Sequence, residues 1–182
     1  MDNGLIPRRY AKALYKFAQE KGQAQRMYAL MKELANNFET QRSLHEVMAN
    51  PFVASADKLS LLITASGAEK KDICFNDFIK LLFENKRIDM IRDIALSYMI
   101  IYRKDNNIRK VEVVTASQLA PEVEMRLKDM IVSHLNGGTM EYTITVNPEL
   151  IGGFVITIDS ERLDASINNE LKQLRLKLLS NN

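Results

Sequence analysis

Few side chains in this sequence combine the residue types and the spacing that catalysis or metal binding requires. The two histidines, His45 and His134, fall in helical segments, and neither has a second ligand at metal-binding spacing. There is no HExxH motif, CxxC pair, glycine-rich phosphate loop or GxSxG turn, and carboxylates such as Glu39 and Glu46 are too scattered to form an acid and base pair. We therefore expect neither an active site nor a bound metal.

The pair Gly152-Gly153 could suggest a phosphate-binding loop. Such a loop leads from a strand into the N-terminus of a helix, whereas these glycines lead into Phe154-Val155-Ile156, which has the pattern of a strand. Glycines before a strand more often allow a bulge or a close approach of two backbones. We therefore expect a structural role for the pair.

Composition and charge exclude several classes of partner. Apolar residues make up 46% of the 182 residues and charged residues 26%, a balance typical of a folded globular chain. The net charge of +2 is too small to attract nucleic acid or an anionic membrane surface. The longest apolar stretch, residues 94–102, is much shorter than the roughly 20 residues of a membrane-spanning helix. We expect a soluble protein that neither inserts into a membrane nor binds nucleic acid.

The single cysteine, Cys74, cannot form an internal disulfide. Its neighbours Ile73 and Phe75 are apolar, so it is expected to be a small buried hydrophobic residue. This usage fits a reducing compartment, and the first residues do not resemble a secretory signal.

The N-terminal part of the chain, residues 1–105, has helical periodicity and no strand signal. The apolar residues of its first segment keep helical spacing until Gly22. Ser55 is predicted to cap the fourth helix, with Asp57 in the first turn, where the helix dipole favours an anion, and with Gly67 at the end. The other four helices are predicted from the apolar positions Met27, Leu30, Met31, Leu34 and Phe38; Leu44, Val47 and Met48; Phe75, Phe78, Ile79, Leu82 and Phe83; and Ile91, Ile94, Ala95, Tyr98, Ile101 and Tyr102. Six short helices with brief connections predict an antiparallel bundle.

The pattern changes in residues 106–182. β-Branched residues alternate along 111–115, which predicts a strand, and further strands are predicted at 140–146, 154–158 and, more briefly, 162–164. Two helices complete this part: one opens at Pro121, and Ser166 caps the other, whose apolar line is Ile167, Leu171, Leu174 and Leu178. The second part is therefore predicted to be a small α/β domain, and the whole chain to have an α+β fold.

Two segments of the sequence resemble a known family. The run Arg9-Tyr10-Ala11-Lys12-Ala13-Leu14-Tyr15, followed by Phe17-Ala18, resembles the first-helix signature of the F-type ATP synthase delta subunits and their mitochondrial relative, the oligomycin-sensitivity-conferring protein. The run from Val146 through Asn147-Pro148-Glu149-Leu150-Ile151 to Gly152-Gly153-Phe154, followed by Asp164-Ala165-Ser166 and a leucine-rich helix, is similar to the family's C-terminal motif. Residues 84–87 match a turn after the fifth helix, so the resemblance runs through the whole chain in order.

The sequence also departs from the family pattern. Asn147 stands where an acidic residue is common, Ala120 is a poor helix cap before Pro121, and Ala165 replaces a frequent glycine. Only the last change has a conformational consequence, because it puts a positive backbone angle at that turn in doubt.

The resemblance implies a non-catalytic stator subunit that connects the catalytic head of the ATP synthase to its peripheral stalk and resists rotor torque, without a cofactor. It implies that residues 1–105 bind the N-terminal helix of the alpha subunit and that residues 106–182 bind the b-type stalk subunit. The missing transit peptide favours a bacterial chain, held at the cytoplasmic face of the plasma membrane through the complex. The implied head contacts are Tyr10, Ala13, Phe17, Phe78, Leu81 and Leu82, and the implied stalk contacts are Gly152, Gly153, Leu174, Leu176, Leu178 and Leu179.

The first helix leaves one question open. It is apolar on two adjoining faces, with Tyr10, Ala13 and Phe17 on one face and the series Ala11, Leu14 and Ala18 on the other. Periodicity alone is equally consistent with a bundle that buries both faces and with one that leaves a face for a partner helix. The family resemblance favours the partner.

Other functions remain open at this point. A helical adaptor or regulatory module unrelated to ATP synthase would also lack an active site, and co-purification with ATP synthase subunits would separate the two. A small-molecule enzyme that uses the α/β part is a third alternative.

Overall fold

The computed structural model describes residues 4–69, 71–135 and 137–180. The chain divides into two compact units, residues 1–105 and 106–182. The first is helical up to the first strand and the second contains a mixed sheet with helices, so the predicted α+β fold is confirmed. None of the helices in the described ranges is both long and apolar enough to cross a bilayer.

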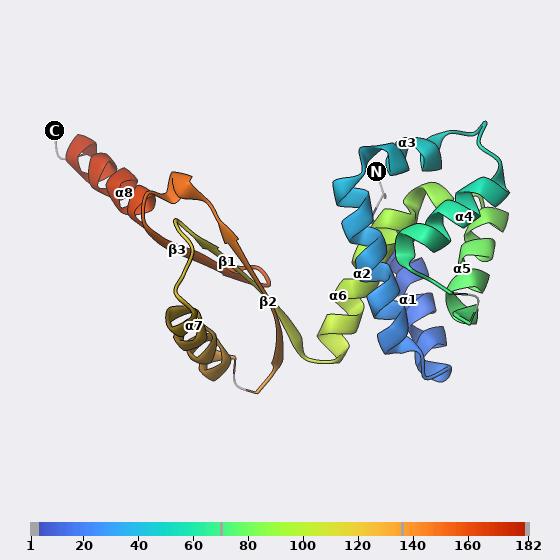
Figure 1. Ribbon diagram of the computed structural model, residues 1–182, viewed down its shortest axis with the longest axis horizontal. Helices are drawn as coiled ribbons and strands as arrows, with labels where there is room; N and C mark the ends of the chain where they lie inside the picture. The colour runs from blue at the N-terminus through green and yellow to red at the C-terminus, as the bar shows by residue number, and fades with distance from the viewer. Residues whose placement is uncertain (1–3, 70, 136, 181–182) are drawn as a thin grey trace. The chain divides into compact units, whose positions relative to one another are not determined.

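Six α-helices form the described part of the first unit (Figure 1). They are α1 (Leu5–Glu20), α2 (Ala24–Thr40), α3 (Arg42–Ala49), α4 (Ser55–Ser66), α5 (Ile73–Glu84) and α6 (Ile91–Asp105), and a short 3₁₀ turn, η1 (Ile88–Met90), precedes α6. The last helix packs against both α1 and α2. Its residues Ile91, Ile94, Ala95 and Tyr98 are fully buried, because their spacing places them on one helical face. The core of this unit is therefore built around α6.

The helix ends in this unit follow local chemistry, with one correction. Gly67 ends α4 in the left-handed conformation, at φ +66°, and Asp57 lies in the first turn, as predicted. The prediction that Ser55 caps α4 was wrong: Ser55 is already helical, Ala54 is the N-cap residue, and no side chain caps this end. Cys74 is buried as expected, at 4% exposure.

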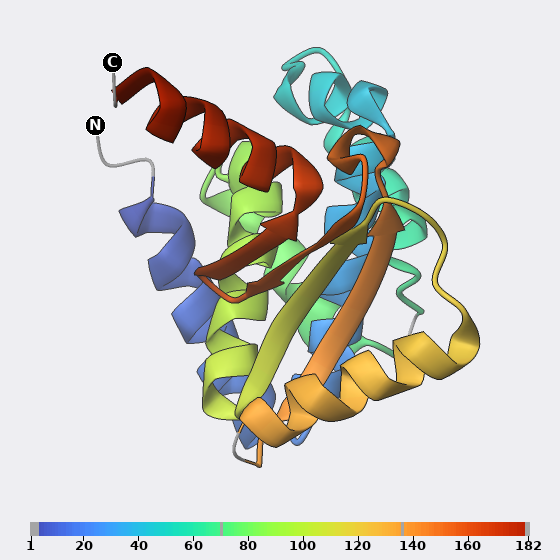
Figure 2. The same cartoon turned by 90° about the vertical axis from the view of Figure 1, so that its left-hand side faces the viewer.

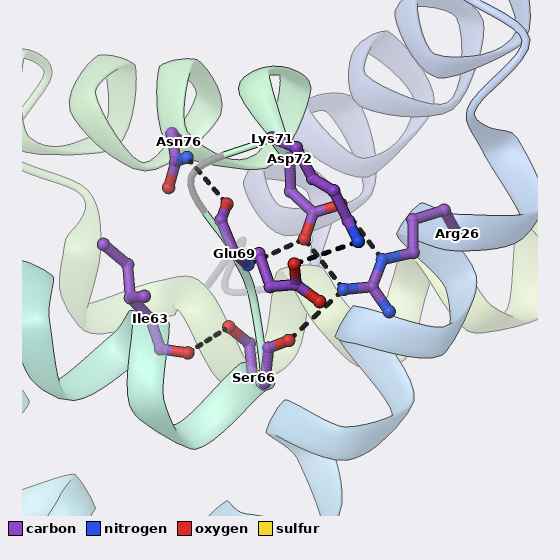
Figure 3. A network of polar contacts seen from close by, with 8 residues as sticks. Arg26, Ile63, Ser66, Glu69, Lys71, Asp72 and Asn76 are labelled. Carbon is purple, nitrogen blue, oxygen red and sulfur yellow. Dashed lines mark hydrogen bonds and ion pairs between the residues drawn. The ribbon is translucent and has the colours of Figure 1, made fainter.

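A polar network fastens α2 to the connection between α4 and α5 (Figure 3). Arg26 donates hydrogen bonds to both carboxylate oxygens of Asp72 and a longer one, 3.3 Å, to the carbonyl oxygen of Gly67. Asp72 also accepts from the backbone N–H of Glu69 at 2.8 Å. The carboxylate of the buried Asp72 is therefore satisfied by several donors.

The second unit is a four-stranded sheet with two helices (Figure 2). Its elements are β1 (Ile108–Thr115), α7 (Pro121–His134), β2 (Thr139–Val146), a 3₁₀ turn η2 (Pro148–Leu150), β3 (Gly153–Ile158), β4 (Glu161–Ser166) and α8 (Ile167–Ser180). The strand order is β2-β1-β3-β4, with β1 and β2 parallel and the other neighbours antiparallel. All four predicted strands are present, and β1 and β4 are longer than the sequence pattern indicates.

The core of this unit lies between α7 and one face of the sheet. In the register, Val113 stands opposite Ile144 on one side and Ile156 on the other, so these side chains share a face. Leu127 and Ile131 of α7 pack against that face. The other face of β1 carries Lys110 and Glu112, so this core uses only one side of the sheet.

Candidate protein-binding sites

The first helix separates its two apolar faces between the core and the surface. Ala11, Leu14 and Ala18 are at most 2% exposed and lie in the bundle core. On the other face Tyr10 is half-buried, Ala13 is exposed and Phe17 is 39% exposed. The bundle therefore buries one face of α1 and leaves the other available.

A shallow groove of about 410 Å³ follows this exposed face. Ile6, Arg9, Tyr10 and Ala13 of α1 line it together with Arg87, which follows the end of α5. The helices α1 and α5 are in contact. We call this surface the α1–α5 groove.

The predicted α5 residues divide between the core and the surface. Leu81 is 44% exposed, whereas Phe78 and Leu82 are 6% and 0% exposed and belong to the bundle core. Phe78 and Leu82 can therefore affect a partner site only indirectly, through the packing of the core. At the other end of the groove face, the ammonium group of Lys21 lies 5.8 Å from the centroid of the Phe17 ring.

The sequence predictions missed three lining residues of the α1–α5 groove. Ile6 lies one helical turn before Tyr10, so the helical spacing of the apolar residues Tyr10, Ala13 and Phe17 could have identified it. Arg9 belongs to the first-helix motif but was not assigned a contact. Arg87 is brought to the groove by the turn after α5, in which Lys86 has a positive φ of 53°; this position has no sequence signal beyond the resemblance of the turn.

The glycine pair of the second unit lies where α8 begins. A Cβ atom on Gly152 would lie 2.5 Å from the Cδ1 atom of Ile167, and the N–H of Ile167 donates to the carbonyl oxygen of Gly152 at 3.0 Å. Gly153 has φ +76°, and a Cβ atom there would collide with the carbonyl oxygen of Ala165 in β4. The expected close backbone approach is therefore confirmed. It fixes the junction between β4 and the first turn of α8, which we call the root of α8.

Side chains before α8 complete this root. The Ser166 hydroxyl donates to Asp164 at 2.6 Å and accepts from the N–H of Asn169 at 3.2 Å, which confirms Ser166 as the helix cap. The hydrogen bond from Ser166 lowers the pKa of the Asp164 carboxyl. Asn168 adds a hydrogen bond to the carbonyl oxygen of Glu149. The Asp164-Ala165-Ser166 motif thus sets where α8 starts and in which direction it leaves β4.

Beyond its root, α8 is exposed on every side. The large apolar side chains of this helix are between 43% and 65% exposed, and they are Ile167, Leu171, Leu174, Leu176, Leu178 and Leu179. The helix starts directly after the last residue of β4, without a loop that could turn it back over the sheet. Its main contacts are with β4 and η2. The sheet therefore does not bury this apolar line.

The residues that could do chemistry are not gathered into a site. His45 is exposed on α3 with its ring 4.9 Å from that of Phe38, and His134 is exposed in the last turn of α7. Within the described ranges, no three His, Cys, Asp or Glu side chains lie close enough to hold a metal ion.

Comparison with known proteins assigns the chain to a family. The family described as "ATP synthase delta (OSCP) subunit" matches residues 6–178, almost the whole sequence. The chain belongs to this family. Its membership removes the alternative of an adaptor unrelated to ATP synthase, and it makes the chain a non-catalytic stator component of an F-type ATP synthase.

Individual relatives are similar in sequence to this delta-family chain along its full length. It is 38% identical over 181 residues to ATP synthase subunit delta of Parabacteroides distasonis, covering 100% of this chain and 99% of the relative. It is 36% identical over 183 residues to the same subunit of Bacteroides thetaiotaomicron, covering 100% and 98%. A chain of the Toxoplasma gondii mitochondrial ATP synthase hexamer, solved by cryo-electron microscopy, has the same fold, with a TM-score of 0.74, 22% identity, and coverage of 96% and 97%.

Proposed function

We propose that the first unit of this delta-family chain binds the N-terminal helix of the alpha subunit in the α1–α5 groove, and that the second unit binds the b-type stalk subunit through α8. One observation carries the proposal: each unit exposes an apolar helix face. Exposed apolar surface of this kind marks an interaction site on a folded protein. The two faces belong to separate units, which suits a connector between two partners.

The shape of the α1–α5 groove supports a helical partner at the head. Ile6, Tyr10, Ala13 and Phe17 are spaced by alternating four and three residues, so they form one continuous stripe along α1. Ala13 lies within the stripe, and its small side chain lets a second helix approach closely. Phe17 offers an exposed aromatic anchor further along the same stripe, and Leu81 of α5 is exposed, whereas Phe78 and Leu82 belong to the bundle core. An amphipathic helix in such a groove can reach nanomolar affinity, about −12 kcal/mol.

The pattern of α8 supports a helical partner at the stalk. Ile167, Leu171, Leu174 and Leu178 also alternate by four and three residues, the a and d spacing of a coiled-coil seam. The remaining two leucines, Leu176 and Leu179, lie off this seam and widen the apolar surface. Gly152 and Gly153 contribute by holding the root of α8 in place. A stalk helix with its own heptad pattern would cover the seam.

Binding without turnover is enough for the stator role. Torque from the rotor would carry the catalytic head around unless a stator held it, so a subunit with one contact to the head and one to the stalk completes that restraint. Through the stalk, the chain would be held peripherally at the cytoplasmic face of the bacterial plasma membrane.

A bridging assay tests the proposal. The stalk subunit's soluble region is immobilised, the full chain is added, and a labelled synthetic peptide of the alpha subunit's N-terminal segment is applied last. Retention of the peptide only when the chain is present is the expected result. If the chain binds one partner only in the absence of the other, the connector role is wrong.

A further inference from the structure

Positive charge surrounds the α1–α5 groove. Arg9 lines it from α1 and Arg87 lines it from the segment after α5. Lys16 lies on the same edge of α1 as Arg9, two helical turns further along. Arg9 and Arg87 are exposed, and among the described residues neither forms an ion pair. The groove therefore offers two unpaired guanidinium groups to whatever occupies it.

These charges do not serve the stability of α1. The N-terminal half of the helix carries Arg8, Arg9 and Lys12, and its first turn has no acidic residue. The positive end of the helix dipole lies at the N-terminus, so cations there are unfavourable and anions favourable. The charge at this end of α1 is therefore the opposite of what the helix dipole favours, so the dipole does not account for Arg9.

Among the described residues of this unit, no carboxylate lines the groove. On α5, Asp77 is paired with Lys80 at 3.6 Å, and Glu84 is exposed near the end of the helix. Glu20 lies at the far end of α1. The part of the groove around Ala13 thus combines an apolar floor with a basic rim.

We infer that the helix bound in the α1–α5 groove is acidic along its flanks, with carboxylates that pair with Arg9 and Arg87. The inference rests on the proposed head contact and adds the chemistry that selects the partner segment. Because these arginines are exposed at the rim, their main effect is on encounter: they accelerate association and reject basic segments, while the apolar floor governs dissociation.

Binding kinetics at two salt concentrations test this. The full chain and the variants Arg9→Glu and Arg87→Glu are titrated with a synthetic peptide of the alpha subunit's N-terminal segment. Measurements at about 0.01 M and about 1 M salt span Debye lengths of about 30 Å and about 3 Å. Lys104→Glu on α6 is the matched control, because it makes the same charge change in the same unit, at an exposed position of another helix that does not line the groove.

We expect each arginine variant to slow association about three- to tenfold at low salt, with little change in dissociation, and to lose most of this deficit at high salt. Lys104→Glu should have a clearly smaller effect. Association that is independent of salt, or equal effects of Arg9→Glu and Lys104→Glu, would overturn the inference.

A neutral variant separates this inference from the proposed function. Ala13→Gln places an uncharged amide on the groove floor and should weaken binding about tenfold or more. If Ala13→Gln weakens binding and the arginine variants do not, the groove is the site and its charge is irrelevant. If Ala13→Gln also leaves binding unchanged, the head contact itself lies elsewhere.

Discussion

Arg26 and Asp72, which are 46 residues apart in the sequence, meet through a two-pronged hydrogen bond, Nε to Oδ1 at 3.0 Å and Nη2 to Oδ2 at 2.8 Å. The Asp72 side chain is 7% exposed and that of Arg26 is 42% exposed. The hydrogen bonds from Arg26 lower the pKa of the Asp72 carboxyl, although burial opposes this shift. The pair ties α2 to the start of α5, the helix that carries the exposed Leu81 and leads into Arg87 of the α1–α5 groove.

Asp72→Asn is expected to destabilise the first unit by about 1–3 kcal/mol, because the replacement removes a charge-assisted pair and leaves Arg26 without its partner. Urea denaturation followed by far-UV circular dichroism measures the change. Asp57→Asn is the control, because Asp57 is an exposed carboxylate in the first turn of α4. Equal effects of the two variants would show that the Arg26 pair does not contribute.

The same pair predicts a pH dependence. The folded-state pKa of Asp72 lies below its unfolded value, so its contribution is fully present above the unfolded pKa of about 3.9 and is lost as the pH falls through the folded pKa. The difference in unfolding free energy between the wild type and Asp72→Asn should therefore be constant near neutral pH and shrink in acid below about pH 4. A difference that stays constant throughout the acid range would contradict the assignment.

Ala13→Asp should weaken head binding without unfolding the chain. Ala13 is exposed, so the cost to the free bundle is limited to helix propensity, about 0.7 kcal/mol. A carboxylate buried against an apolar helix costs several kcal/mol, and pairing with the neighbouring Arg9 offsets only part of this cost, so affinity should fall about tenfold or more. Calorimetric titration with the alpha-subunit peptide measures it, and Ala29→Asp, on an exposed position of α2, should bind normally. Normal binding by a folded Ala13→Asp chain would remove Ala13 from the site.

Gly153→Ala should loosen the root of α8. The new methyl group would meet the backbone of Ala165, and the φ of +76° is unfavourable for any residue with a Cβ atom. Gly22→Ala shares the positive φ, +66°, but has open space around it, so it should cost only about 1–2 kcal/mol. Gly153→Ala should increase the rate of amide hydrogen exchange in β3 and β4. This increase should be larger than the increase that Gly22→Ala causes in the residues around Gly22. The reverse order would show that the close approach is unimportant.

Stalk binding should depend on α8 while folding does not. Leu174 is 55% exposed, so Leu174→Glu should change stability by at most about 0.5 kcal/mol and weaken stalk binding about tenfold or more. Gln173→Glu introduces the same charge off the seam and is the control. Deleting the chain from Leu176 onward should abolish stalk binding and spare the alpha-peptide contact. Wild-type stalk affinity in the truncated chain would place the joint elsewhere.

Much of the fold could be predicted from periodicity. Helical spacing identified the helices of the first unit, and alternating β-branched residues identified the strands of the second. The spacing of α5 also contained information that the contact prediction did not use. Phe78 and Leu82 lie on the line that defines the core face of this helix, and Leu81 lies outside it. Membership of a core line is therefore an argument against direct contact with a partner.

Periodicity could not determine which apolar faces the tertiary structure covers. The two faces of α1 are nearly equal in sequence, and the packing of other helices against α1, chiefly α6, distinguishes the buried face from the exposed one. The apolar line of α8 would fit a core helix equally well. It stays exposed because β4 runs into α8 without a loop, a geometric fact that side-chain hydrophobicity does not encode.

The exposed leucines of α8 also affect the chain before it joins its partners. A helix that exposes a continuous line of apolar side chains tends to self-associate and to be recognised by chaperones and proteases. A copy synthesised in excess of its stalk partner would therefore be recognised through α8 and degraded, whereas a copy whose α8 is covered by the stalk would be protected. The surface that makes the joint would in this way also regulate subunit stoichiometry.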